Sequence, residues 1–467
     1  MMNLVRFSIV TCLLVALSVS VSAGTQGDLK IPDVKYSTMT LDNGLRIFVL
    51  EDHKVPLVNF AVWYKVGSID EHEGITGISH MLEHNMFHGT KTTEADFVHT
   101  MVKDVGGQNN AGTFFDYTMY YENVPTAKLE LAVAMEADRM RNLLLPDDKF
   151  ESERLVLMQE RRQRVENQMF ASIMEEIRAL SFEQHGLHHD ICGWMKDLQS
   201  ITHDDLVNYY TTFYAPNNAV VIVSGDVKPQ KVFDLVKQYF GSHKPQEIKR
   251  TVVTEPIQTK ERIVTIEKIT QVPYIIDYYR LPAGNNKDYV ALQFLLTILI
   301  NDPNSRINTE LMKTKQNIMG AFGYALGLRD AGFCMIGFVP NSVDKIEEVK
   351  QGYEAELKKL IDNGITDEEL AKVKKSILKN TIFTQKSTEA IAQEMAQNII
   401  RYDDPEFYKK QLQWVKNITK EEIIAAAKKY LVPENRTRGI VLPKVEKKEE
   451  PVKTETDKKQ SNEKKGK

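Results

Sequence analysis

Alternation of apolar and polar residues predicts strands near the start of the globular region. TLDNGLRIFVLED has an Asn-Gly turn signal at Asn43 between two such runs, and PLVNFAVWYKVGS, from Pro56, predicts another strand. The stretch from Pro146 to about Ser181 instead carries apolar residues at a helical period among charges: Leu155, Val156, Val165, Met169, Ile173 and Ile177. Strands that pair, with helices packed on them, indicate the α+β class.

One segment of the chain occurs twice. ITHDDLVNYYTTFYAPNNAVVIV begins at Ile201, ITKEEIIAAAKKYLVPENRTRGIV begins at Ile418, and the two align without a gap when Ile201 is set on Ile418. Each predicts a threonine-capped helix that opens with acidic residues, ends before a proline and turns into a strand. This succession is common, so coincidence is the alternative, but the gapless length favours duplication.

Duplication predicts two homologous αβ halves, each a mainly antiparallel sheet with helices packed on it. The first half spans residues 30–243 and the second spans residues 262–443, and the charged, proline-bearing segment 244–261 links them. Residues 444–467 are almost wholly charged or polar without an apolar period, which predicts a disordered tail. An interaction tether is the alternative for this tail.

The N-terminus is typical of a cleavable secretory signal peptide over residues 1–23. MMNLVRFSIVTCLLVALSVSVSAGTQ places Arg6 before an apolar run and ends that run with Val21-Ser22-Ala23. The run is shorter than the roughly 20 residues that a membrane span needs. We therefore expect cleavage after Ala23, no stable membrane span thereafter, and a periplasmic protein secreted across the inner membrane. An extracellular protein, or one retained by an uncleaved anchor, is the alternative.

Composition narrows the classes of function. The 467 residues are 42% hydrophobic, which suits a large globular enzyme of two to three domains. The formal net charge of -4 provides no basic field of the kind that nucleic-acid binding needs, so we expect no nucleic-acid partner. After signal cleavage only Cys192 and Cys334 remain, so stability must come from the apolar core rather than from a disulfide framework.

HMLEH, His80 to His84, is the strongest chemical signal. Residues three or four apart share a face of a helix, so His80 and His84 can point at one ion while Glu83 lies over the same spot. Imidazoles and carboxylates suit zinc, which lowers the pKa of a bound water so that a neighbouring carboxylate can take its proton. A polar helix face with partly buried histidines is the alternative, but H-x-x-E-H is the inverted zincin motif. His88 is close enough to line the same cleft.

A third metal ligand is needed, and the residues alone leave its identity open. Glu160, Glu166 and Glu175 are all acids on the predicted helical stretch. Glu153 precedes Glu160 by seven residues, close to two helical turns, so these two share a face. HGLHH, residues 185–189, predicts a loop face rather than a second metal site, because no carboxylate or cysteine spacing completes one.

The chain resembles the pitrilysin and insulinase family of zinc metallopeptidases over nearly the whole mature sequence. The resemblance rests on HMLEH with the following FHGT, on GGQNNAGTFFDYTMYYENVP, and on FESERLVLMQERRQRVEN. The second segment is similar to the family's Asn-Ala-x-Thr edge strand and the third to its acidic helix. The chain is most similar to the branch with the mitochondrial processing peptidase β-subunit and secreted bacterial zinc proteases.

This resemblance implies a zinc endopeptidase with one Zn²⁺ per chain. It implies that Glu160 is the third ligand beside His80 and His84, that Glu153 is a supporting carboxylate, and that Glu83 activates the zinc-bound water. Supporting groups of this kind orient ligands.

The resemblance also gives the strand near residue 110 a substrate role. An exposed strand edge accepts an extended peptide by backbone pairing without demanding one sequence. It implies that Asn110, Ala111 and Thr113 bind peptides or unfolded polypeptides. If the strand were interior, it would bind no substrate.

The second half departs from the family. Self-sufficient relatives supply an arginine and, seven residues on, a tyrosine that hold the substrate, but the alignment on Leu311 puts Met312 and Met319 there. Neither thioether can donate a hydrogen bond. Three polar residues lie nearby: Arg306, Lys313 and Tyr324. The alternative is that Arg306 is structural and that both methionines pack in the core.

The departure predicts a partner. We expect a heterodimer in which a related subunit without the zinc motif supplies the arginine and the tyrosine; a homodimer, or a monomer that uses Lys313 and Tyr324, is the alternative. The second half has no motif of its own, since the alignment of Ile201 with Ile418, extended without gaps, sets Thr297, Ile300 and Asn301 at the places of His80, Glu83 and His84. The rival functions are a non-catalytic, core-like assembly subunit, against which the intact motif argues, and a peptide-binding chaperone.

Overall fold

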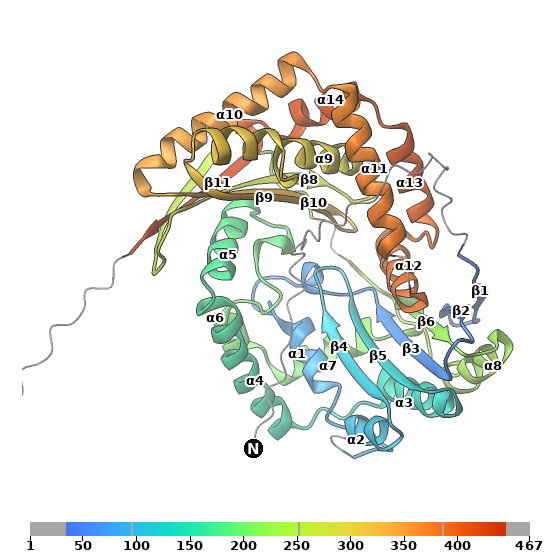
Figure 1. Cartoon of the computed structure of the whole chain (residues 1–467). Helices are drawn as coiled ribbons and strands as arrows, with labels where there is room; N and C mark the ends of the chain where they lie inside the picture. Colours follow the sequence, from blue (N-terminus) through green and yellow to red (C-terminus); the bar gives the residue numbers. More distant parts are fainter. Residues whose placement is uncertain (1–33, 95–96, 251–252, 385–386, 445–467) are drawn as a thin grey trace, which may run out of the picture. The chain divides into compact units, whose positions relative to one another are not determined.

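Two sheets organise the described part of the chain (Figure 1). The computed structural model describes residues 34–94, 97–250, 253–384 and 387–444, which belong to the unit Val34–Lys467. The expected signal peptide, and the expected tail from residue 445 on, lie outside the described residues. No helix in the described ranges combines the length and the apolar character that crossing a membrane would require.

The first sheet has the strand order β1-β2-β6-β3-β5-β4. Its strands are β1 Ser37–Thr40, β2 Arg46–Glu51, β3 Leu57–Tyr64, β4 Gln108–Thr113, β5 Thr118–Pro125 and β6 Ala219–Gly225. All neighbours are antiparallel except β2 and β6, which are parallel. The predicted Asn-Gly turn joins β1 to β2, and Gly44 has a φ of 88°, a conformation that glycine adopts without strain.

The second sheet repeats this arrangement, although the described residues include no counterpart of β1. Its order is β7-β11-β8-β10-β9, and only β7 and β11 are parallel. The strands are β7 Arg262–Lys268, β8 Tyr274–Pro282, β9 Ile318–Gly327, β10 Ala331–Pro340 and β11 Arg436–Pro443. The predicted α+β class and its two mainly antiparallel halves are therefore confirmed.

The helices follow the same repeat. They are α1 Ile78–Asn85, α2 Phe97–Asp104, α3 Leu129–Asn142, α4 Asp147–Arg161, α5 Met169–Ser181, α6 Met195–Ser200, α7 His203–Phe213, α8 Pro229–Phe240, α9 Asp288–Leu296, α10 Ile346–Asn363, α11 Asp367–Thr384, α12 Thr388–Tyr402, α13 Phe407–Asn417 and α14 Lys420–Tyr430. Helices α7 and α14 begin at aligned positions of the repeat, and Thr202 and Thr419 cap them in matching capping boxes. The predicted succession of cap, helix, proline turn and strand is confirmed in both halves.

One predicted helix is two. The stretch from Pro146 to Ser181 forms α4, a π-helical turn over Arg162–Glu166, and α5, with extended backbone at Gln168 between them. The break lets the two helices pack in different halves, because α4 contacts α1 of the first half whereas α5 contacts β7, β8 and β11 of the second.

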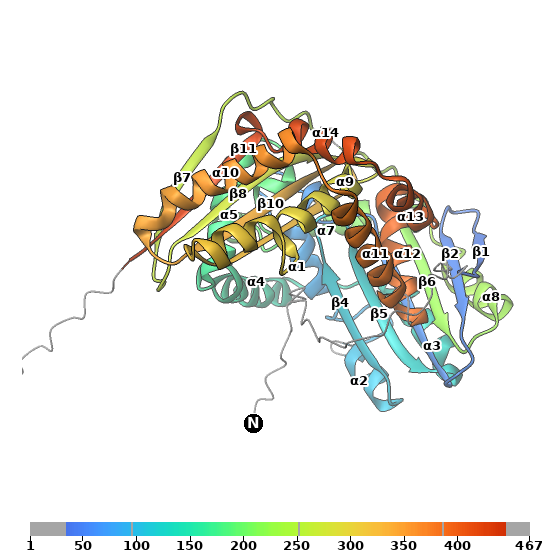
Figure 2. The ribbon, with the colours of Figure 1, turned by 45° about the horizontal axis from the view of Figure 1, so that its top comes forward.

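One helix of each half packs on the sheet of the other half (Figure 2). Ile173 and Ile177 of α5 are fully buried against Tyr278 and Phe333 of the second sheet. Helix α12 contacts β2, β3 and β6, which are the counterparts of the strands that α5 covers. The opposite face of each sheet packs on helices of its own half and forms the two main apolar cores.

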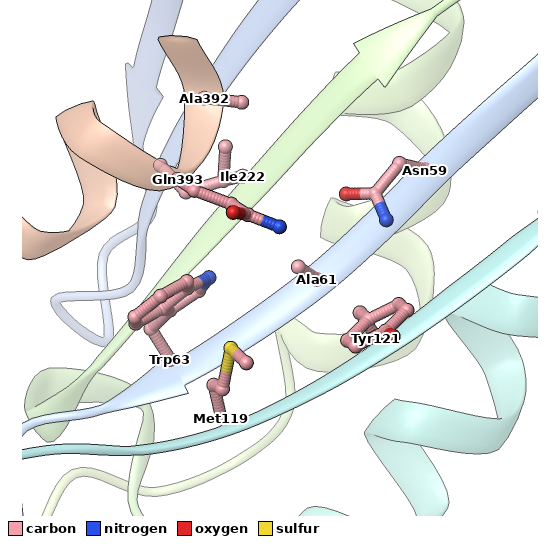
Figure 3. Close-up of a pocket in the computed structure, with 8 residues that line it drawn as sticks. All are labelled: Asn59, Ala61, Trp63, Met119, Tyr121, Ile222, Ala392 and Gln393. Atoms are coloured by element: carbon pink, nitrogen blue, oxygen red, sulfur yellow. The ribbon is translucent and has the colours of Figure 1, made fainter. Parts of the chain in front are cut away.

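A small cavity lies between α12 and the first sheet (Figure 3). It is lined by Asn59, Ala61, Trp63, Met119, Tyr121, Ile222, Ala392 and Gln393. Its volume of about 10 Å³ is the room that one water molecule needs. It is therefore too small to hold a peptide side chain.

Candidate metal centre

The H-x-x-E-H motif lies on α1, as its spacing predicts. Ile78 and Leu82 are fully buried in the core of the first half. The helix also contacts α4 and β4, and on it His80 is buried whereas Glu83 and His84 are half-buried. Core packing on one side thus fixes the helix that carries the polar motif.

Two buried carboxylates hold the segment at the start of α1. The N-cap is Gly77, which has no side chain to pair with the free N–H groups of the first turn. Glu71 does this instead, accepting the N–H of Gly77 at 2.7 Å and that of Ser79 at 2.9 Å. Asp197 accepts the N–H of Thr76 at 3.3 Å and its hydroxyl at 2.7 Å. Burial raises the pKa of Glu71 to about 8.

Helix α4 brings Glu160 to the two imidazoles. Its Oε2 lies 3.3 Å from His84 Nε2 and 4.0 Å from His80 Nε2, and one ligand atom of each residue lies within 4.8 Å of the others. Tetrahedral zinc with bonds of about 2.0–2.1 Å separates its ligand atoms by about 3.3 Å. The donor set therefore fits zinc after small side-chain shifts. Across the part of the chain that the structure describes, no other such group of His, Cys, Asp and Glu occurs.

The other two acids of this stretch, Glu166 and Glu175, contact Arg161 instead. Glu175 pairs with Arg161 at 2.8 Å, and Glu166 lies 3.4 Å from the same guanidinium. Of the three acids, Glu160 is the one whose carboxylate lies beside both imidazoles.

Glu153 joins two histidines. Its Oε2 lies 3.0 Å from His84 Nδ1, and its Oε1 lies 2.9 Å from His88 Nε2. Because a carboxylate accepts hydrogen bonds, His84 directs a protonated Nδ1 at Glu153. His84 Nε2 then remains as the nitrogen that can bind an ion.

The charges of Glu153 and Glu160 around His84 favour the binding of a cation. Burial lowers the pKa of His84, but hydrogen bonds with Glu153 and Glu160 outweigh it and raise the pKa to about 9. Burial raises the pKa of Glu160, but the hydrogen bond with His84 and nearby positive charge bring it to about 2. Hydrogen bonds with His84 and His88 lower the pKa of Glu153 to about 2. Both carboxylates are thus ionised at neutral pH, and a metal ion can replace the proton that His84 holds.

Glu83 lies beside the edge of the first sheet. Thr113, the last residue of β4, donates its hydroxyl to Glu83 Oε2 at 2.7 Å. β4 stands at one end of the strand order, and Asn110 and Ala111 pair with Tyr121 and Tyr120 of β5. The predicted edge position of this strand is therefore confirmed.

The HGLHH histidines lie in a loop, as predicted, but two of them are buried. His185 lies 3.3 Å from Asp330, and His189 lies 3.7 Å from Glu71 with its pKa lowered to about 4 by burial. Their surroundings are those of packed side chains.

In the second half, the residues considered for substrate contact have different surroundings from one another. Met312 packs against the second apolar core, whereas Met319 lies on β9 and is 53% exposed, so the expectation of core packing holds for Met312 alone. Arg306 donates to Glu369 at 2.8 Å and to a backbone carbonyl, which is the structural role considered above.

Two polar residues remain near the methionines. Lys313 donates to Asn304 at 2.7 Å, and Tyr324 is 46% exposed on β9. Ile300, which the alignment of Ile201 with Ile418 sets at the place of Glu83, is fully buried in the second core. The second half therefore has a packed apolar side chain where the first half has the carboxylate of its motif.

Comparison with known proteins identifies the family. Residues 46–193 match the family described as Insulinase (Peptidase family M16), and residues 200–377 match the Peptidase M16 inactive domain. Zinc protease PqqE of Helicobacter pylori is 32% identical over 374 residues, which cover 79% of this chain and 84% of that protein. The chain belongs to peptidase family M16.

Further relatives agree with this M16 assignment. The probable mitochondrial-processing peptidase subunit beta of Arabidopsis thaliana is 28% identical over 274 residues, 58% of this chain and 51% of that protein. The crystal structure of a protease from Helicobacter pylori superposes with a TM-score of 0.82 at 30% identity, covering 88% of this chain and 99% of that one. The predicted family is confirmed, and members of it carry zinc protease names.

Proposed function

We propose that this M16 chain is a zinc-dependent endopeptidase that hydrolyses peptides or unfolded polypeptides. The supporting observation is the convergence of His80, His84 and Glu160, whose ligand atoms lie within 4.8 Å of one another, with Glu83 beside them on α1. Hydrolysis gives Glu83 a role as general base, which peptide binding alone does not require.

His80, His84 and Glu160 hold one zinc ion per chain in this proposal. When bound, zinc lowers the pKa of a water molecule and polarises the scissile carbonyl. Glu153 holds the ring of His84 through Nδ1, which keeps Nε2 turned toward Glu160.

Glu83 is the general base. It takes a proton from the water as the water oxygen bonds to the carbonyl carbon, and it delivers that proton to the nitrogen as the peptide bond breaks. The hydroxyl of Thr113 donates to Glu83 at 2.7 Å and so orients the carboxylate. The peptide pairs as an added strand with the β4 edge at Asn110, Ala111 and Thr113, which brings its backbone next to Glu83.

A second subunit completes the site. Neither Met312 nor Met319 can hold a substrate carbonyl by a hydrogen bond, and Arg306 is engaged with Glu369. We therefore propose a heterodimer with a related subunit that lacks the zinc motif. A homodimer, or a monomer that uses Lys313 and Tyr324, is the alternative.

The domain limits and the location are also proposals. Residues 30–243 form the metal-bearing half, 244–261 the linker and 262–443 the half without metal, which agrees with the end of α8 at Phe240 and the start of β7 at Arg262. The N-terminal pattern supports a signal peptide and the periplasm.

The deciding experiment compares the zinc-loaded mature chain with Glu83→Gln in the hydrolysis of an unstructured fluorogenic peptide. Loss of a general base slows such reactions by about 10²–10⁴-fold. We expect Glu83→Gln to bind zinc as the parent does and to lose at least two orders of magnitude in kcat/KM, and a chelator to abolish the activity of the parent until zinc is restored.

Other outcomes separate the rivals. Equal activity of both proteins would refute the role of Glu83. Stoichiometric zinc without hydrolysis in either protein would call for the missing subunit, and failure to gain activity with that subunit would favour a core-like assembly protein. Absence of zinc binding would refute the metallopeptidase proposal.

A further inference from the structure

His88 lies in the turn that follows α1, outside the H-x-x-E-H motif. Its backbone N–H donates to the carbonyl of Asn85 at the end of α1, and its Nε2 lies 2.9 Å from Glu153 Oε1. Glu153 Oε2 in turn lies 3.0 Å from His84 Nδ1. One carboxylate of α4 is therefore held at both oxygens by two histidines of one short segment, and all three side chains are largely shielded from solvent.

We propose that His88 is a positioning residue for the metal centre, acting through Glu153 on His84. The inference rests on the proposed zinc site and adds a residue that the ligand set does not include. With one oxygen anchored, a carboxylate can still rotate about its terminal bond. The second anchor fixes its plane, and so fixes the direction in which it holds the ring of His84.

The surroundings of the His88 ring determine how it acts. Its Nδ1 is buried and has no hydrogen-bond partner among the described residues, whereas its Nε2 meets Glu153. A buried N–H without a partner costs more than a buried lone pair that has none, so the ring proton belongs on Nε2. His88 therefore serves as a donor to Glu153. The low pKa of Glu153, about 2, agrees with a carboxylate that receives hydrogen bonds from both histidines.

The second half provides an internal comparison. Helices α4 and α11 begin at corresponding aspartates, Asp147 and Asp367, and this alignment sets Val373 at the place of Glu153 and Asn380 at that of Glu160. The second half builds the matching strands and helices without the histidine–carboxylate pair. The contact is thus absent from the half that lacks the metal ligands, which agrees with a role for it at the metal centre.

The test measures zinc affinity by competition with a chromogenic chelator, without substrate. Replacing groups that orient metal ligands typically costs 10–100-fold in affinity. We expect His88→Leu to raise the zinc Kd by about 10-fold. His88→Gln, which keeps an N–H donor, should restore most of the loss. His53→Leu is the matched control, because His53 also contacts two carboxylates, Asp226 at 2.7 Å and Glu51 at 3.3 Å, but not the metal ligands.

A double-mutant cycle with Glu153→Gln separates positioning from a general structural effect. If His88 works through Glu153, His88→Leu adds no further loss of zinc affinity in the Glu153→Gln background. The thermal midpoint of each metal-free variant is recorded alongside. Unchanged zinc affinity in His88→Leu, a loss that His88→Gln does not restore, or full additivity with Glu153→Gln would each overturn the inference.

Failure of the inference is distinguishable from failure of the proposed function. A parent chain that cleaves peptide through Glu83 while His88→Leu binds zinc normally keeps the function and loses the inference. A parent chain that binds zinc but cleaves no peptide, either alone or with the missing subunit, loses the function, and the affinities of the His88 variants still decide the inference. A parent chain that binds no zinc refutes both.

Discussion

At the scale of single residues, the site is held by groups that no local pattern reveals. HMLEH could be found because its members lie within one helical turn of one another. Glu71 and Asp197, which hold the start of the same helix, are 6 and 121 residues from the groups that they bind. The role of His88 cannot be predicted from the sequence, because its partner, Glu153, is 65 residues away.

The Glu71 carboxyl gives a prediction about stability and pH. Its pKa is about 8 in the folded protein and returns to 4.5 on unfolding. The folded state therefore holds a proton that the unfolded state lacks between these values, and stability falls as pH rises. His189 has the opposite effect below pH 6.5, because burial lowers its pKa from 6.5 to about 4 and the folded state then binds fewer protons.

His84, whose pKa rises from 6.5 to about 9, also contributes between pH 6.5 and about 8, so the effect of Glu71 is isolated by comparison with a variant in which only Glu71 is changed. We expect the urea midpoint of the parent chain to fall across this window relative to that of Glu71→Gln, whose amide does not titrate. Asp204→Asn serves as the control, because that carboxylate lies in the first turn of another helix, α7. If the urea midpoints of the parent and of Glu71→Gln changed equally with pH across this window, Glu71 would be ionised in the folded protein over the whole window.

At the scale of elements, the sequence predicts those features that neighbouring residues determine. The threonine caps and the Asn-Gly turn are found where the residues place them, and the edge strand is found where the family resemblance places it. The sequence does not predict the break between α4 and α5, because the residues around it include neither proline nor glycine. The packing of α5 on the second sheet requires this break, and the apolar period of the stretch carries no information about its partner.

Helix α5 gives the second prediction. Ile173 is fully buried between the halves, and replacing such a residue by alanine typically costs about 2–5 kcal/mol. We expect Ile173→Ala to lower the free energy of unfolding, measured with urea, by an amount in this range. Leu155→Ala on α4 is the matched control, because Leu155 is 65% exposed and surface changes usually stay within about 0.5 kcal/mol. Equal losses for both variants would contradict the described placement of α5.

At the scale of the whole molecule, buried ion pairs join the halves. Asp70 accepts from Arg250 of the linker at 3.0 Å and from Arg329 of the β9–β10 turn at 2.9 Å. Asp116, which follows β4 and is fully buried, accepts from Arg401 of α12 at 2.9 Å. These contacts span from 180 to 285 positions, so no sequence pattern could predict them.

The Asp116–Arg401 pair gives the third prediction. Removing one partner leaves a buried charge uncompensated and typically costs about 3–5 kcal/mol. Arg401→Met should therefore destabilise the chain by this amount, and the double variant Asp116→Asn with Arg401→Met should recover part of the loss. Urea unfolding of the single and double variants completes the cycle. A double variant as unstable as the sum of the single variants would mean that the pair does not couple the halves.

The exchange of α5 and α12 has a consequence for the ancestry of this chain. A gene that encoded only one half would yield a sheet with one bare face, which a second copy could cover with its own helix. Two such chains would form an obligate symmetric dimer by swapping helices. Fusion through a linker would make that association independent of concentration.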